Sequence, residues 1–144
     1  MGTPLDSTAA LEIRERFSYF FDGLVDRVEL DRLSDRREQR RAVVRVLAAE
    51  SPSEDWYSIT FELEGLRAFK LGEGRTSHIV LSDGLGIHHL PEGVFLDLAP
   101  FVDLYPFTSA DVNPDLVWRS HQYLVGSSCT YRVEPLGPDT TPAA

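Results

Sequence analysis

The chain contains one cysteine, Cys129, among its 144 residues. A single thiol cannot form an internal disulfide, and without a second cysteine there is neither a zinc ribbon nor a thiol relay. The cysteine content therefore fits a protein of the reducing cytosol.

Long apolar runs are also missing. No stretch approaches the roughly 20 apolar residues that a helix needs to cross a bilayer. Residues 1–6 lack the basic start and apolar run of a secretory signal. We therefore expect a soluble, cytoplasmic protein that does not enter a membrane.

Motifs that carry catalysis are absent as well. No Gly-x-Ser-x-Gly elbow surrounds Ser127 or Ser128, and Cys129 lies in an alternating pattern typical of a half-buried structural thiol. Residues 72–77 are rich in glycine, but they lack the lysine and the strand-to-helix context of a phosphate-binding loop. The sequence predicts no catalytic residue and no cofactor.

Histidines offer the remaining metal candidates. The chain has no HExxH, HxH or CxxC pattern. Neighbouring residues on a strand point to opposite faces, so His88 and His89 could share an ion only if the backbone turns there, which Gly84 and Gly86 would permit. We predict no metal site and expect two histidines in loops and two in strands. The four histidines are His78, His88, His89 and His121.

Composition indicates one globular domain. The chain is 42% hydrophobic and 26% charged, and its length allows a single sizeable core. We expect one domain over residues 1–144, with loose tails at about residues 1–5 and 135–144.

One helix is predicted near the N-terminus. Asp6 or Ser7 can cap it, and Gly23 can close it. Its apolar positions would pack on a sheet, while its polar residues would turn outward. The apolar positions are Leu11, Ile13, Phe17, Phe20 and Phe21, and the outward residues are Arg14, Arg16 and Asp22.

The rest of the chain has strand patterns. In residues 57–63, apolar side chains alternate with polar ones, and Gly65 then interrupts the alternation in the manner of a bulge. Turn residues at high density between short apolar runs indicate antiparallel pairing. We predict an α+β fold in which the helix packs on a curved, mostly antiparallel sheet of about six to eight strands. Expected strands cover residues 24–33, 42–49, 57–63, 66–71, 78–81 and 94–98, and a final hairpin joins 116–125 to 129–133 about 126–128.

Two connections have specific interpretations. The glycine-rich residues 72–74 are predicted to turn between residues 66–71 and 78–81. Residues 34–41 are highly charged and connect two predicted strands, with a short helical turn within 35–41 as the alternative.

Charge is unevenly distributed. The net charge is −9, and residues 50–144 carry fourteen acids but five bases, whereas residues 1–49 carry nine of each. Such a field repels a phosphate backbone and attracts a basic partner. Direct binding of nucleic acid is therefore not expected.

Candidate surface residues follow from the strand pattern. Glu62 and Glu64 would project from one side of their strand, about 6–7 Å apart, which is typical of a solvated strand face although it also permits paired acid and base roles. Aromatic residues near strand ends can anchor interfaces. We predict Trp56, Glu62, Glu64, Asp83 and Asp97 as partner-binding residues.

The chain resembles small bacterial immunity proteins that accompany polymorphic toxins, and also the YxiG-like families of unassigned role. The similar segments are Phe20-Phe21-Asp22-Gly23, the charged hairpin, residues 59–66 and residues 120–126. Together they span roughly residues 17–133. The resemblance implies a non-catalytic α+β fold that acts by binding, and it assigns no functional residue.

These observations lead to one main expectation and two alternatives. The main expectation is a non-catalytic, cytoplasmic binding protein of the immunity type, which neutralises a partner such as a basic toxin domain. The first alternative is a small-ligand protein or enzyme with its pocket inside the curved sheet, near His88 and His89, with Asp83, Asp97 or His121 also at its mouth. The second is an assembly subunit that docks through residues 99–114.

Overall fold

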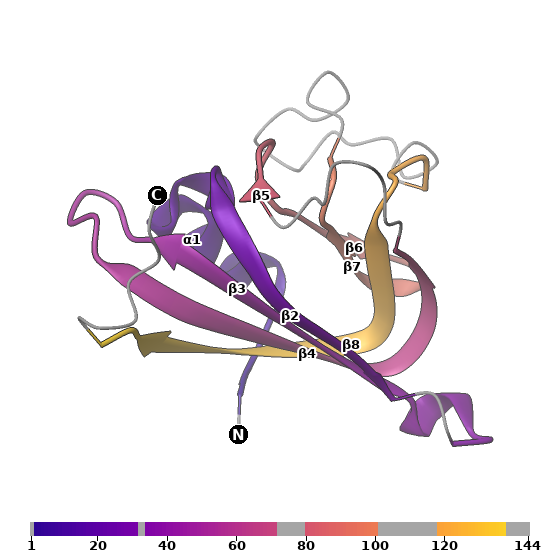
Figure 1. Ribbon diagram of the computed structural model, residues 1–144. Coiled ribbons are helices and arrows are strands. Elements are labelled where there is room, and N and C mark those ends of the chain that lie inside the picture. The colour runs from indigo at the N-terminus through magenta and orange to yellow at the C-terminus, as the bar shows by residue number, and fades with distance from the viewer. Residues whose placement is uncertain (1, 32–33, 72–79, 101–117, 138–144) are drawn as a thin grey trace.

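The computed structural model describes residues 2–31, 34–71, 80–100 and 118–137. The predicted fold class is confirmed: one N-terminal helix packs on a curled antiparallel sheet (Figure 1). The helix is α1 (Ser7–Arg16), and η1 (Ser18–Phe20) and η2 (Arg37–Gln39) are short 3₁₀ turns. The strands are β1 (Thr3–Pro4), β2 (Gly23–Asp31), β3 (Arg41–Ala49), β4 (Trp56–Lys70), β5 (Val80–Leu81), β6 (Gly86–Leu90), β7 (Gly93–Asp97) and β8 (Tyr123–Pro135).

The sheet has the strand order β5-β2-β3-β4-β8-β7-β6, and β1 pairs with β8 outside this path. The long strands β4 and β8 pair along most of their length and bend together (Figure 1). This bend curls the sheet around α1. Within the described residues, no helix combines the length and the apolarity that crossing a membrane requires.

The helix begins as predicted. The Asp6 side chain accepts a hydrogen bond from the backbone N–H of Ala9 at 2.8 Å and so caps α1. The predicted helix end is wrong, because α1 stops at Arg16 and Gly23 begins β2. Ser18, Tyr19 and Phe20 have positive φ angles of 51°, 59° and 62°, which turn the chain from helix to strand.

Arg14 also differs from its prediction. It was expected to face outward, but it is 6% exposed. Ala10 lies four residues before Arg14 and Phe17 lies three residues after it, so Arg14 shares the buried face of the helix with them. The Arg14 guanidinium lies 5.5 Å from the centre of the Tyr19 ring, which gives the buried charge a cation–π contact.

The main core lies between α1 and the inner face of β3 and β4. Ile59, Phe61 and Leu63 are fully buried, as their predicted alternation requires. The Phe20 ring lies 6.2 Å from the Phe61 ring, which joins η1 to β4. Fully burying a side chain of this size contributes about 1.5–3 kcal/mol.

The predicted interruption at Gly65 is confirmed as an irregularity within one strand. Gly65 has a φ of +60°, and the β4–β8 register shifts between Leu66 and Ala68. Residues 57–63 and 66–71 therefore belong mainly to β4, which continues through the irregularity.

The predicted C-terminal hairpin is wrong. Residues 126–128 lie inside β8, which is one strand from Tyr123 to Pro135. A Cβ atom at Gly126 would lie 2.8 Å from the carbonyl oxygen of Glu64, so this glycine allows close approach to β4 where β8 bends. The glycine at 126 that predicted a turn between two strands instead lies where one strand bends.

Other expectations have mixed outcomes. Residues 91–92 join β6 to β7, and the helical alternative for 35–41 is confirmed by η2. The sequence did not predict β6, because Gly84 and Gly86 indicated a turn at this point. The turn at 72–74, His78 and most of the 99–114 excursion lie outside the described residues.

Candidate functional site

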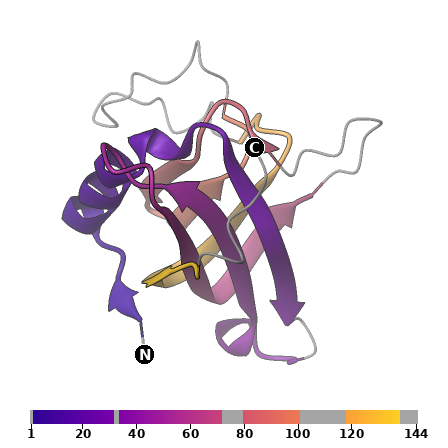
Figure 2. The same cartoon turned by 60° about the vertical axis from the view of Figure 1, so that its left-hand side comes forward.

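We define the outer face as the side of β2, β3, β4 and β8 that is turned away from the main core. Figure 2 shows these strands with α1 to one side of them. In β4, Trp56, Glu62 and Glu64 are on the outer face, because Tyr57, Phe61 and Leu63 pack in the core. Trp56 and Glu64 are about 26 Å apart along the strand at 3.3 Å per residue. Three of the predicted partner-binding residues therefore share one extended surface.

Side chains of β3 and β8 beside those of β4 make the outer face partly charged and partly apolar. Glu62 lies between Val43 of β3 and Thr130 of β8, and Glu64 lies between Arg41 and Ser128. Trp56 is opposite Ala49. Half-buried apolar side chains thus alternate with charged ones across the face.

Three arginines of the outer face already have acidic neighbours. Arg45 pairs with Asp26 at 3.0 Å, Arg132 pairs with Glu134 at 3.6 Å, and Arg27 pairs with Glu29. In the part of the chain that the structure describes, no ion pair includes Glu62 or Glu64. Their carboxylates are therefore available to a cation from outside the chain.

Trp56 has an acidic setting. Glu54 and Asp55 precede it in an exposed loop, and Glu134 of β8 lies opposite Ser58 on the same face. The Trp56 side chain is half-buried, and its carbonyl accepts a hydrogen bond from the N–H of Leu136. A fixed aromatic residue with acids around it suits an anchor for a basic surface.

Asp97 does not join this surface, which corrects its prediction. It is fully buried at the end of β7. Its carboxylate accepts hydrogen bonds from the Ser120 hydroxyl at 2.5 Å and from the Ala99 N–H at 3.0 Å. It was predicted as an exposed acid for a partner, but it acts as an internal acceptor that connects the end of β7 to the segment before β8.

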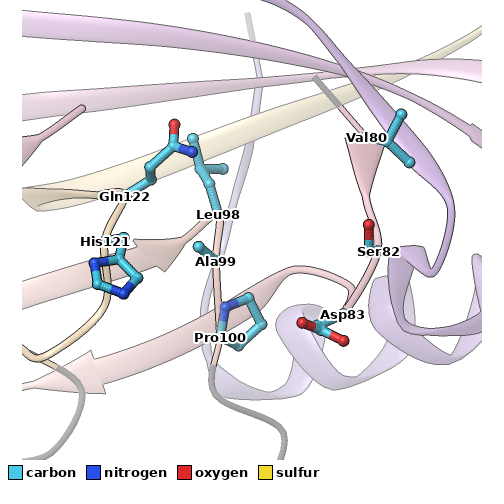
Figure 3. A pocket seen from close by; sticks show the side chains of 8 residues that line it. All are labelled: Val80, Ser82, Asp83, Leu98, Ala99, Pro100, His121 and Gln122. Carbon is cyan, nitrogen blue, oxygen red and sulfur yellow. The ribbon is translucent and has the colours of Figure 1, made fainter. Parts of the chain in front are cut away.

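Asp83 lies apart from the outer face, in the exposed turn after β5. It lines a hollow of about 290 Å³, which we call the seam hollow (Figure 3). One wall comes from Val80, Ser82 and Asp83. The opposite wall comes from the segment that follows β7 and the segment that precedes β8, namely Leu98, Ala99, Pro100, His121 and Gln122.

The seam hollow joins distant parts of the sheet. In the strand order, β5 is first and β7 is next to last, yet the segments that adjoin them line one space. Only the curl of the sheet brings them together. Of the residues predicted at the mouth of a pocket, Asp83 and His121 line this hollow, whereas His88, His89 and Asp97 do not. Ser82 and Gln122 were not predicted, because no local pattern marks them.

The two adjacent histidines occupy opposite faces of β6. His88 is 5% exposed and lies 6.2 Å from the Phe95 ring, whereas His89 is exposed and its Nε2 lies 2.8 Å from the Leu5 carbonyl oxygen. Burial lowers the pKa of His88 to about 4, with a smaller contribution from the positive charge of Arg14. The described residues contain no group of three or more His, Cys, Asp or Glu side chains placed to hold a metal ion.

Comparisons with protein-family models, with curated proteins and with solved structures find no match for this chain. The resemblance to immunity proteins stays a prediction from the sequence.

Proposed function

We propose that the chain is a cytoplasmic, non-catalytic binding protein of the immunity type, which neutralises a basic partner such as a toxin domain. The observation that carries the proposal is the placement of Trp56, Glu62 and Glu64 on one outer face. In the complex, the outer face would lie against the active surface of the partner and so block it.

Local charge supports a basic partner. Glu62 and Glu64 belong to none of the ion pairs found among the described residues, while the nearby arginines 27, 45 and 132 are each beside a carboxylate. A cationic side chain of the partner can therefore bind Glu62 or Glu64 without displacing an existing ion pair. Pairs of this kind fix orientation and raise the association rate.

Apolar contacts would supply much of the remaining affinity. Val43 and Leu47 of β3 are half-buried on the outer face, and Trp56 is half-buried at its end. Interfaces are typically held by a few aromatic or apolar anchors within a polar rim. The net charge of −9 adds long-range attraction toward a basic protein.

The test uses the full chain, tagged and purified from its own cells. The retained proteins are identified by mass spectrometry, and the main basic protein is then expressed alone and together with this chain. We expect the captured protein to arrest growth when expressed alone and co-expression to restore growth. We also expect the double variant Glu62→Lys, Glu64→Lys to lower the affinity by about a hundredfold, since each reversed charge costs about 1.4 kcal/mol or more.

A matched control separates local contact from overall charge. Glu12 of α1 and Glu92 of the β6–β7 turn are exposed acids outside the outer face. The double variant Glu12→Lys, Glu92→Lys changes the net charge equally and should retain the affinity. Equal loss in both double variants, or no loss in either, would exclude the outer face as the binding surface. A captured protein that does not affect growth would contradict the immunity role.

A further inference from the structure

We propose that the seam hollow binds a small organic cation, an ammonium or guanidinium group on a short apolar stem. This site is separate from the proposed partner surface, since none of its lining residues belongs to the outer face of β4. The juxtaposition that carries the proposal is an acidic wall from β5 facing an apolar wall from the end of β7.

The negative charge of Asp83 favours a cationic ligand in the hollow. Asp83 is the one acidic or basic side chain among the described lining residues, apart from His121. Figure 3 shows Asp83 and His121 on opposite sides of the Ala99 and Pro100 segment. In the described part of the chain, no hydrogen bond or ion pair engages the Asp83 carboxylate. A cation that enters the hollow can therefore bind this carboxylate without displacing an internal partner.

The apolar wall selects the stem. Val80 is 40% exposed beside the acidic turn, whereas Leu98 and Pro100 are buried across from it. These side chains offer a hydrocarbon surface next to the carboxylate. Pockets that combine an apolar lining with a few polar groups are typical of small-molecule sites, and a volume of about 290 Å³ suits a small ligand.

Polar side chains at the rim add orientation. The Ser82 hydroxyl and the Gln122 side-chain amide both line the hollow. They could donate to, or accept from, a second polar group on the ligand. The site would therefore prefer a stem with a hydroxyl or amide over a plain alkyl chain.

Both walls are held in place before any ligand arrives. The Leu98 N–H donates to the Gln122 carbonyl at 2.9 Å, and the Asp97–Ser120 hydrogen bond lies directly behind. On the other wall, the Leu81 carbonyl accepts from the N–H groups of Asp22 at 2.9 Å and Gly84 at 3.1 Å. Fixed walls reduce the ordering cost of binding.

The experiment is a titration of the ¹⁵N-labelled full chain with n-butylammonium chloride, followed by amide NMR shifts. The comparison compounds are 1-butanol, which keeps the stem without the charge, and sodium butyrate, which reverses the charge. We expect saturable shifts at Ser82, Asp83, Ala99 and Gln122 with n-butylammonium, at a dissociation constant on the order of millimolar. The two comparison compounds should give no saturable shift at these residues.

Variants test the role of the carboxylate. Asp83→Asn keeps the size of the side chain and should weaken n-butylammonium binding by about tenfold, because it removes a charged partner. The control is Asp55→Asn, an exposed acid of the loop before β4, which should bind as the unaltered chain does. Amide spectra that overlay outside the hollow confirm that both variants fold.

Several results would contradict the proposed cation site. They are the absence of saturable shifts with n-butylammonium, equal affinity in Asp83→Asn, saturable shifts confined to other residues, and equal binding of 1-butanol. Because this test needs no protein partner, its failure leaves the proposed partner surface unaffected, and failure of the capture experiment leaves the hollow unaffected.

Discussion

The hydroxyl of Ser120 donates a hydrogen bond to the carboxylate of Asp97 at 2.5 Å, and both residues are fully buried. The same hydroxyl lies 3.1 Å from the Gln122 carbonyl, and it accepts from the Gln122 N–H at 3.2 Å. One small side chain therefore fixes the end of β7, the start of β8 and one wall of the seam hollow.

Removing this hydroxyl should destabilise the fold. Ser120→Ala leaves a buried carboxylate without one of its donors, which we expect to lower the free energy of unfolding by about 1.5–3 kcal/mol. Urea unfolding followed by fluorescence measures the change. Ser128→Ala, at an exposed position of β8, is the control and should stay within about 0.5 kcal/mol of the unaltered chain. Equal stability of the two variants would contradict a structural role for the Ser120 hydroxyl.

Acid should destabilise the protein through His88. The pKa of His88 is about 4 in the folded chain, compared with 6.5 for the ordinary side chain, because burial disfavours its charged form. The unfolded chain therefore binds a proton first as the pH falls. Stability from this group is complete above pH 6.5 and is lost progressively between pH 6.5 and about 4, to a total of about 3 kcal/mol.

The variant His88→Leu isolates this contribution. It cannot take up the proton, so its free energy of unfolding should change less with pH over the same range. The measurement is the difference in unfolding free energy between the variant and the unaltered chain at several pH values. A constant difference between His88→Leu and the unaltered chain would rule out His88 as the source.

Gly93 should tolerate no side chain. It has a φ of +135°, and a Cβ atom there would lie 2.0 Å from the carbonyl oxygen of Gly126. Gly93→Ala must therefore shift the backbone where β7 pairs with the bend of β8, and we expect a loss of at least about 3 kcal/mol.

Gly23→Ala provides a graded comparison for that variant. Its Cβ atom would lie 3.1 Å from the Phe20 carbonyl oxygen, which is tight but far less severe. Thermal unfolding should place Gly23→Ala between the unaltered chain and Gly93→Ala. The reverse order would show that the close approach at Gly93 does not limit stability.

Cys129 should react with thiol reagents only after the chain opens. Burial raises the pKa of its thiol to about 12, and the negative charge of Glu62 adds to the rise. The thiolate is the reactive form. At pH 8 we expect an aromatic disulfide reagent to label the native chain very slowly and the chain in guanidinium chloride rapidly. Rapid labelling of the native chain would contradict the buried position of this thiol.

Local features of the fold could be predicted from the sequence. The Asp6 cap, the alternation of β4 and the interruption at Gly65 each depend on a few neighbouring residues, and the structure confirms them. The period of apolar residues reports which face is buried without knowledge of the partner strand. For the same reason, Glu62 and Glu64 could be placed on the polar side of β4.

Features that depend on strand pairing could not be predicted. The glycine at 126 indicates a turn or a bend equally well from the sequence, and only the pairing of β8 with β4 decides for the bend. Asp97 is an acid near the end of the predicted strand 94–98 and was expected on the surface, but it is buried and its hydrogen-bond donors are Ser120 and Ala99.

The sequence by itself determined that this chain has a capped N-terminal helix, an antiparallel sheet with one wet face, and an acidic second part. The tertiary structure decided which distant segments meet. Trp56, Glu62 and Glu64 share a face through the pleat of one strand, whereas Asp83 and His121 line one hollow because the sheet curls. A strand's own period fixes the first relationship, and the second requires contacts between segments far apart in the chain, which no local pattern records.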